Sequence, residues 1–157
     1  MSGQTENSRA AAGKTPAKSP RRRARELVMQ GVYQWRLSGA GTAQIEQRMK
    51  DEKNLGRYDT ELFGGLLRGV LGHHADLEAA LVPHLDRPAS ELSPVEFSIL
   101  LVAAYEMLMQ PETPYRVIIN EAVELAKTYG GTDGHRFVNG VLDKLAAVAR
   151  PLEVRSK

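Results

Sequence analysis

Apolar side chains recur at intervals of three and four residues through most of this 157-residue chain, which is the spacing of one face of an α-helix. The only β-branched run, residues 117–119, lies within this helical spacing, and no strand-like alternation bounded by turn residues competes with it. Helices are expected over about residues 20–37, 42–50, 59–81, 94–109, 114–129 and 134–149. The pattern therefore predicts an all-α domain.

Two of these helices carry clear start signals. Ser19 and Pro20 suit an N-cap and a first helical position. Ser93 and Glu96 are spaced for a capping box, in which each side chain binds the other's backbone N–H. The apolar run after them, residues 97–109, is hydrophobic on nearly every side, which predicts a central helix.

The first helix is expected to bury one face and expose the other. The buried stripe consists of Ala24, Leu27, Val28, Gly31, Val32 and Trp35. The opposite side carries Arg22, Arg25, Met29, Tyr33 and Arg36, so arginines share it with a tyrosine. Elsewhere, the glycines Gly65, Gly69 and Gly140 lie inside helical patterns, where they predict close approach by another element.

Length and composition predict one domain with short tails. Residues 1–18 lack apolar periodicity and are expected to be a disordered basic tail, residues 19–151 the domain, and residues 152–157 a C-terminal tail. The absence of cysteine fits a cytoplasmic protein. The sequence contains no run of 18 apolar residues, so no membrane span is expected. The N-terminus also lacks the apolar core of a secretory signal.

Positive charge is concentrated at the start of the chain. Residues 1–36 hold eight Lys or Arg and two acids, and the other 121 residues hold 13 and 17. A basic end on an acidic body is typical of an anion-binding arm, and nucleic acid is the commonest anion; a solubilising tail is the alternative. Arg21, Arg22, Arg23 and Arg25 concentrate this charge at a helix N-terminus, where it opposes the helix dipole unless phosphate offsets it.

Patterns typical of enzymes and metal sites are missing from the sequence. It has no Gly-x-Ser-x-Gly elbow, no phosphate-binding Gly-rich loop and no pair of histidines four residues apart. Glu121 and Glu124 share a helix face but lack a nearby Glu-x-x-His motif for metal. We therefore expect a binding protein that has no catalytic residues, metal or cofactor.

Three segments resemble the NusB family in order and spacing. They are the basic start Arg21–Glu26, the helical segment Ile119–Lys127 and the segment His135–Lys144 that follows a Gly-rich turn. The resemblance covers about residues 21–151. It implies about seven helices in two packed subdomains. It also implies binding of boxA RNA in nascent ribosomal RNA operon transcripts, as a heterodimer with the ribosomal protein NusE. With other Nus factors, the heterodimer joins RNA polymerase and suppresses premature, mainly Rho-dependent, termination.

The resemblance also assigns individual residues. RNA binding maps onto Arg21, Arg22, Arg23, Arg25, Asp133, Arg136 and Phe137, and NusE binding onto Tyr33 and Glu96. For three of these residues a purely structural role remains open: helix capping for Glu96 and Asp133, and core packing for Phe137. Whether the free protein is a monomer or a homodimer also stays open.

Two other functions fit part of the pattern. NusB-like modules also occur as RNA-binding domains of ribosomal RNA cytosine methyltransferases, but this chain has no room for a catalytic domain and lacks the Cys nucleophile. A protein-interaction module would aim its arginines at an acidic partner. Binding to such a partner should not depend on RNA sequence.

Overall fold

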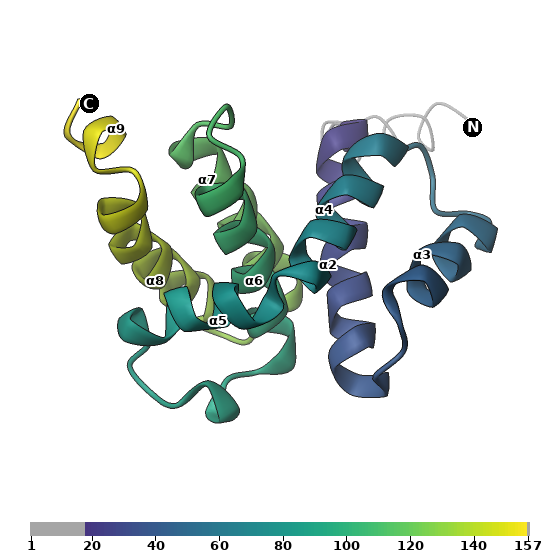
Figure 1. The fold of residues 1–157 in the computed structure, drawn as a ribbon, viewed down its shortest axis with the longest axis horizontal. Helices are drawn as coiled ribbons and strands as arrows, with labels where there is room; N and C mark the ends of the chain where they lie inside the picture. Colours follow the sequence, from purple (N-terminus) through teal and green to yellow (C-terminus); the bar gives the residue numbers. More distant parts are fainter. Residues whose placement is uncertain (1–17, 157) are drawn as a thin grey trace, which may run out of the picture.

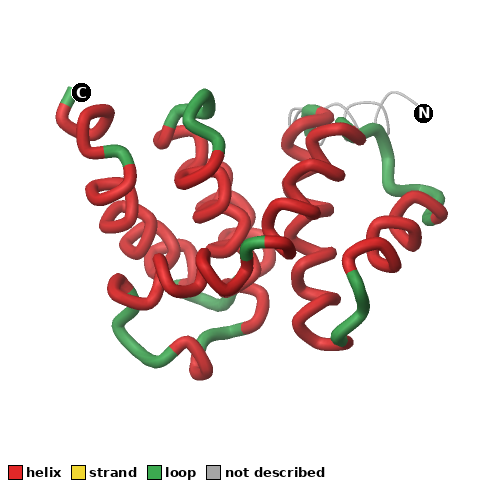
Figure 2. Tube along the Cα trace, viewed as in Figure 1, coloured by secondary structure: helices red, strands yellow, loops and turns green. Residues whose placement is uncertain are grey.

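The computed structural model describes residues 18–156, and this part of the chain is helical and has no strand (Figure 2). Except for Lys18, the tail predicted over residues 1–18 lies outside the described residues. The helices are α2 (Pro20–Ser38), α3 (Thr42–Asp51), α4 (Thr60–Gly72), α5 (His74–Leu81), α6 (Pro94–Met109), α7 (Tyr115–Tyr129), α8 (Gly134–Ala149) and α9 (Pro151–Arg155). Two 3-10 turns, Val82–His84 and Ala89–Glu91, join α5 to α6. The all-α prediction is confirmed.

The helices form two packed groups (Figure 1). Helices α2, α3 and α4 lie on one side, and α5, α7, α8 and α9 on the other. Helix α6 packs against α2, α4, α5, α7 and α8, and is therefore the central element of the core. Its side chains are buried around almost the whole helix, as the all-round apolar pattern predicts.

The first helix begins where its sequence signals place it. The Ser19 hydroxyl accepts a hydrogen bond from the backbone N–H of Arg22 at 3.1 Å, and Pro20 occupies the first helical position. The helix ends at Gly39, whose φ of +71° suits glycine, and the Gly39 N–H donates to the carbonyl of Trp35. These local contacts set the two ends of α2 and place its arginines in the first turns of the helix.

The single long helix expected over residues 59–81 is wrong, because the chain breaks at His73 into α4 and α5. His73 leaves the helical region, and its ring Nδ1 lies 2.9 Å from the carbonyl oxygen of Gly69 in the last turn of α4. The break lets α4 cover α2 while α5 turns across α6 and α8. One straight helix would not cover both surfaces.

The glycine predictions are confirmed at one position and wrong at two. A Cβ atom on Gly69 would lie 2.2 Å from Cζ of Tyr105, so α6 approaches α4 closely there. A Cβ on Gly65 or Gly140 would meet no atom within 4 Å. Those two glycines therefore do not mark a close approach.

Residues 152–155, which were assigned to a C-terminal tail, belong to the short helix α9. Arg150 connects this helix to the core through its largely enclosed guanidinium, which donates to Glu153 at 2.6 Å. The same guanidinium donates to backbone carbonyls in the last turn of α6 and the loop after it, those of Glu106, Met107, Gln110 and Thr113. The carbonyls of Glu106 and Gln110 also accept the backbone N–H groups of Gln110 and Thr113. Arg150 is therefore the donor that the carbonyls of Met107 and Thr113 depend on at the end of α6. No helix within residues 18–156 is long and apolar enough to cross a membrane.

Candidate nucleic-acid interface

The four arginines at the start of α2 differ widely in exposure. The exposed fraction of the side chain falls from 58% for Arg21 to 43% for Arg22, 22% for Arg23 and 7% for Arg25. Each guanidinium lies within 4 Å of a carboxylate. The arginines therefore do not form one exposed basic face.

The prediction that Arg25 lies on the exposed side of the first helix is wrong. Its Nε and Nη2 donate to the two carboxylate oxygens of Glu106 on α6, at 2.9 and 3.0 Å. Arg25 precedes Val28 and Val32 by three and seven residues, so it borders the buried stripe of α2. Met29, which was expected on the same exposed side, is also buried.

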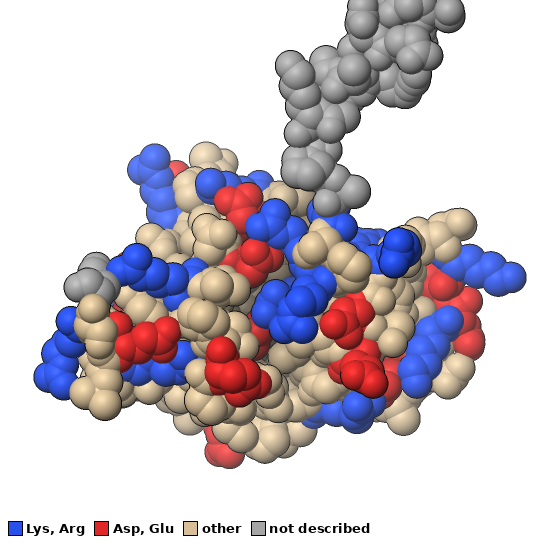
Figure 3. Space-filling model, turned by 90° about the horizontal axis from the view of Figure 1, so that it is seen from above, with Lys and Arg blue, Asp and Glu red and all other residues tan. Residues whose placement is uncertain are grey.

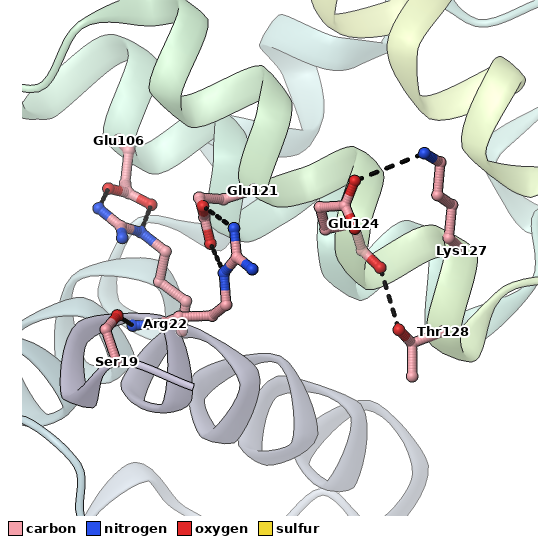
Figure 4. Close-up of polar contacts among 8 residues, drawn as sticks. Ser19, Arg22, Glu106, Glu121, Glu124, Lys127 and Thr128 are labelled. Atoms are coloured by element: carbon pink, nitrogen blue, oxygen red, sulfur yellow. Dashed lines mark hydrogen bonds and ion pairs between the residues drawn. The ribbon is translucent and has the colours of Figure 1, made fainter. Parts of the chain in front are cut away.

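Arg22 forms a second forked pair, with Glu121 on α7. Its Nε donates to Oε1 at 3.0 Å and its Nη2 to Oε2 at 2.8 Å. This hydrogen-bonded carboxylate raises the pKa of Arg22. Glu106 and Glu121 lie side by side, each holding a guanidinium from α2 (Figure 4). The beginning of α2 is thereby fastened to both α6 and α7.

Glu26 is the centre of a third polar cluster. Its buried carboxylate accepts hydrogen bonds from Lys18 at 2.6 Å, from Arg23 and from the hydroxyl of Tyr129 at the end of α7. Burial by itself would raise the pKa of Glu26, but these three hydrogen bonds outweigh it and lower the pKa. Arg23 also donates to the Leu55 carbonyl at 2.8 Å, so both of its edges are occupied.

Acidic residues distant in sequence thus neutralise much of the basic end. The partners of Arg22 and Arg25 lie 99 and 81 residues further along the chain. On the face where α2 begins, basic and acidic side chains are interspersed rather than separated (Figure 3). Sequence reasoning missed Glu26, Glu106 and Glu121 as partners of the arginines. Only the position of Arg25 beside the apolar stripe signalled such a pairing.

Glu96 supports the loop between α7 and α8. Ser93 caps α6 as predicted, by accepting the Glu96 N–H at 3.3 Å. The reciprocal half of the capping box is wrong, because the Glu96 carboxylate instead accepts the N–H of Gly131 at 3.0 Å. A Cβ on Gly134 would lie 2.3 Å from the same carboxylate oxygen. Glycine at position 134 therefore lets this buried carboxylate reach the loop.

Asp133 and Arg136 are exposed around the start of α8. Asp133 stands at the N-cap position, but its side chain makes no capping hydrogen bond; its carbonyl accepts the Arg136 N–H at 3.1 Å. Arg136 borders an open groove of about 440 Å³ between α7 and α8, together with Arg116 and Asn120. Both side chains are accessible to a ligand.

Phe137 is half-buried rather than a fully enclosed core residue. The guanidinium of Arg87, from the loop between α5 and α6, lies 4.7 Å from the centre of its ring. This distance is typical of a cation–π contact. The aromatic ring thus packs on the core while a basic side chain covers one of its faces.

Tyr33 and Glu96 lie at the same end of the α2–α6 pair. The two helices run antiparallel: Arg25 contacts Glu106, and Arg36 lies 4.3 Å from the ring centre of Phe97. Tyr33 stands one turn before Arg36 and Glu96 directly before Phe97. The ten residues from Glu96 to Glu106 rise roughly 15 Å along α6. The arginines at the start of α2 therefore lie about 15 Å along the helix from Tyr33 and Glu96. Because Glu96 binds the loop before α8, the start of α8, with Asp133, Arg136 and Phe137, also belongs to this second end.

Glu121 and Glu124, which share a face of α7, bind different partners instead of one metal. Glu121 binds Arg22, and the Glu124 side chain lies 3.5 Å from Lys127 (Figure 4). Within residues 18–156, no group of three His, Asp or Glu side chains is placed to hold a metal ion.

Comparison with known proteins identifies the family. The model of the NusB family matches residues 22–147. The chain belongs to the NusB family. The matched range includes Arg22, Arg25 and their carboxylate partners, and it ends before Arg150 and α9.

Two relatives named NusB are similar over almost the whole chain. The transcription antitermination protein NusB of Dechloromonas aromatica (strain RCB) is 55% identical over 144 residues, covering 92% of this chain and 88% of the relative. The protein of the same name from Nitrosomonas eutropha is 53% identical over 149 residues, covering 95% and 89%.

Solved NusB structures share the fold. T. maritima NusB superposes with a TM-score of 0.75 at 28% identity, covering 88% of this chain and 99% of that one. A structure of the antitermination factors NusB and NusE in complex with dsRNA matches with a TM-score of 0.73 at 23% identity, covering 81% and 96%. The arrangement of two packed helical groups is therefore that of NusB.

Proposed function

We propose that this NusB family member is a transcription antitermination factor. In this proposal it binds boxA RNA of nascent ribosomal RNA operon transcripts as a heterodimer with NusE. Together with other Nus factors on RNA polymerase, it suppresses premature Rho-dependent termination in the cytoplasm. The observation that carries the proposal is the 55% identity, over 92% of the chain, to a protein named transcription antitermination protein NusB. The role is one of binding, not catalysis.

The start of α2 is the proposed phosphate-binding surface. Arg21 is 58% exposed and lies 3.6 Å from Asp59, the loosest of the four arginine pairings, so it is free to turn to a phosphate. Arg22 is exposed along one edge, and Arg23 borders the same surface. The guanidinium of Arg25 is enclosed between α2 and α6. We therefore propose that Arg25 holds this surface in place and does not contact phosphate.

The residues at the start of α8 form a cluster that is the proposed site for bases. Phe137 and the guanidinium of Arg87 offer planar groups on which an unpaired RNA base can stack. Arg136 adds positive charge beside them, and Asp133 can accept a base N–H. A single strand lying along α2 would contact the arginines and this cluster together.

Tyr33 and Glu96 are the proposed NusE contacts. Tyr33 is half-buried near the C-terminal end of α2, where its ring can be covered by a partner. Glu96 is mostly enclosed and holds Gly131, so in our proposal it shapes the surface that NusE meets. This assignment places the NusE side near the base-binding cluster and away from the arginines.

The test is fluorescence anisotropy of labelled boxA RNA and a scrambled RNA of equal composition. Each RNA is titrated with the full chain, with and without NusE of the same organism. Preference for boxA, tightened by NusE, is the expected result. Equal binding of both RNAs with no effect of NusE would instead make the chain a general anion binder or a protein-interaction module.

A further inference from the structure

We propose that Glu121 is a positioning residue that sets how Arg22 meets RNA. The inference rests on the proposed function and adds an acidic residue to a surface otherwise defined by its arginines. In this view Glu121 fixes the direction of one guanidinium and lowers its attraction for RNA of any sequence.

The hydrogen bonds leave one edge of Arg22 available. A guanidinium has five N–H groups, and Glu121 occupies the one on Nε and one of the two on Nη2. The two N–H groups of Nη1 and the second of Nη2 remain, and together they form another fork of the kind that binds a phosphate. The Arg22 side chain is 43% exposed, while Glu121 is only 15% exposed. Arg22 can therefore bind a phosphate while Glu121 stays attached behind it.

The scaffold around Glu121 makes it a firm anchor. It lies on α7, and the buried Arg25–Glu106 pair lies next to it, in a narrow space also lined by Glu121 (Figure 4). A free arginine side chain loses rotamer freedom when it binds. Because Glu121 already restricts Arg22, less of that freedom remains to be lost when a phosphate binds at the right place.

Glu121 favours a phosphate at the free edge of Arg22, but its negative charge weakens non-specific binding of RNA. Its carboxylate offsets the unit charge of Arg22, so a phosphate at an arbitrary position gains less from approaching it. An RNA that places a phosphate at the free edge still gains the two directed hydrogen bonds. Glu121 thus lowers the affinity for RNA of any sequence and raises the preference for an RNA that places a phosphate at this edge.

The test uses Glu121→Gln in the full chain, with the boxA and scrambled RNAs as probes. Glutamine keeps one acceptor for Arg22 and removes the charge. Affinity for scrambled RNA should rise about two- to fivefold, the range expected for a partly exposed ion pair. Affinity for boxA should rise less, so the ratio of the two affinities should fall.

The double variant shows whether the effect passes through Arg22. In an Arg22→Ala background, Glu121→Gln should change neither affinity by more than about 1.5-fold. Arg22→Ala by itself should make the slope of log affinity against log salt shallower by about 0.7, which is the loss of one phosphate contact on a single strand. An equal gain with and without Arg22 would show that Glu121 repels RNA directly and would overturn the proposal.

The matched control is Glu124→Gln. It removes the same charge from α7 one turn away and leaves the fork between Arg22 and Glu121 intact. The boxA ratio should fall much less than with Glu121→Gln, because Glu124 acts on Arg22 only through its more distant charge. If this control lowered the ratio as much as Glu121→Gln, the effect would be one of general charge, which contradicts positioning.

A second variant keeps the proposal testable if Glu121→Gln fails to fold. Arg22→Lys retains the positive charge but lacks the fork, so the boxA ratio should fall here too. An unchanged ratio in this variant would overturn the inference. Failure of the proposed function would appear separately, as wild-type protein without any boxA preference, and would remove the basis of the Glu121 assignment as well.

Discussion

Arg25 on α2 and Glu106 on α6 form a buried ion pair through two parallel hydrogen bonds of 2.9 and 3.0 Å. The pair joins the two helical groups at their contact, since α2 belongs to one group and α6 is the central helix. Both side chains are shielded from water, and each charge is neutralised by the other. A residue that the sequence assigns to RNA binding is therefore part of the internal structure.

Removal of one member of this pair should be costly. Arg25→Met leaves the Glu106 carboxylate buried without its partner, and the free energy of unfolding should fall by about 3–5 kcal/mol. Urea denaturation followed by circular dichroism measures it. Arg21→Ala, which removes an exposed arginine one turn away, should change stability by less than about 0.5 kcal/mol. A double variant, Arg25→Met with Glu106→Leu, should regain most of the loss; equal stability of wild type and Arg25→Met would contradict this account.

Phosphate binding and NusE binding should depend on different ends of α2. Arg21→Ala should weaken binding of both boxA and scrambled RNA and reduce the salt slope by about 0.7, because a phosphate contact is lost. It should leave NusE affinity unchanged. Tyr33→Ala should do the reverse, lowering NusE affinity while RNA binding without NusE stays as in wild type. Calorimetric titration with NusE and anisotropy with RNA test the separation, and loss of NusE binding in Arg21→Ala would show that the surfaces are assigned wrongly.

Glu26 should make stability depend on pH in the acid range. Its pKa is lowered in the folded protein from the ordinary 4.5, because hydrogen bonds from Lys18, Tyr129 and Arg23 outweigh the effect of burial. Its contribution is therefore complete above the unfolded pKa and is lost as the pH falls toward the folded pKa. The difference in unfolding free energy between wild type and Glu26→Gln should be largest near pH 7 and shrink below about pH 4.5. Urea titrations across this range measure it, and a difference that stays constant would refute the assignment.

Gly69 should tolerate no larger side chain without cost. Gly69→Ala places a Cβ 2.2 Å from Cζ of Tyr105, so the tyrosine ring must move, and stability should fall by about 1–3 kcal/mol. Gly140→Ala is the matched control, since a Cβ there meets nothing within 4 Å. This control should stabilise the protein by up to about 1 kcal/mol, because alanine favours helix. Thermal unfolding of the two variants should therefore shift in opposite directions.

Arg150 should matter although it lies outside the region that the family model matches. Arg150→Ala leaves the carbonyls of Met107 and Thr113 without their side-chain donor and removes a second donor from those of Glu106 and Gln110, so the free energy of unfolding should fall by about 2–4 kcal/mol. Arg155→Ala, an exposed change in α9, should alter it by less than about 0.5 kcal/mol. Similar melting curves for the two variants would mean that the hydrogen bonds of Arg150 add little to the stability of the fold.

The sequence by itself determined the helical class, most helix boundaries and the family. Ser19, Pro20 and Ser93 act on neighbouring backbone groups, so their effect can be read locally. The apolar spacing likewise placed the central helix α6, because the burial of a helix face follows from its own residues. The break at His73 escaped this reasoning, since the apolar stripe continues through it.

Only the tertiary structure decided which charges are free. Arg22 and Arg25 look alike in the sequence, but one keeps an open edge toward solvent and the other is enclosed beside Glu106. The same holds for Glu96, whose carboxylate accepts the N–H of Gly131, 35 residues away, instead of that of Ser93. The energy of a charged group depends on its solvation and on partners that folding brings from distant parts of the chain. Neither the solvation of a charged group nor its distant partners can be read from residue type and local spacing.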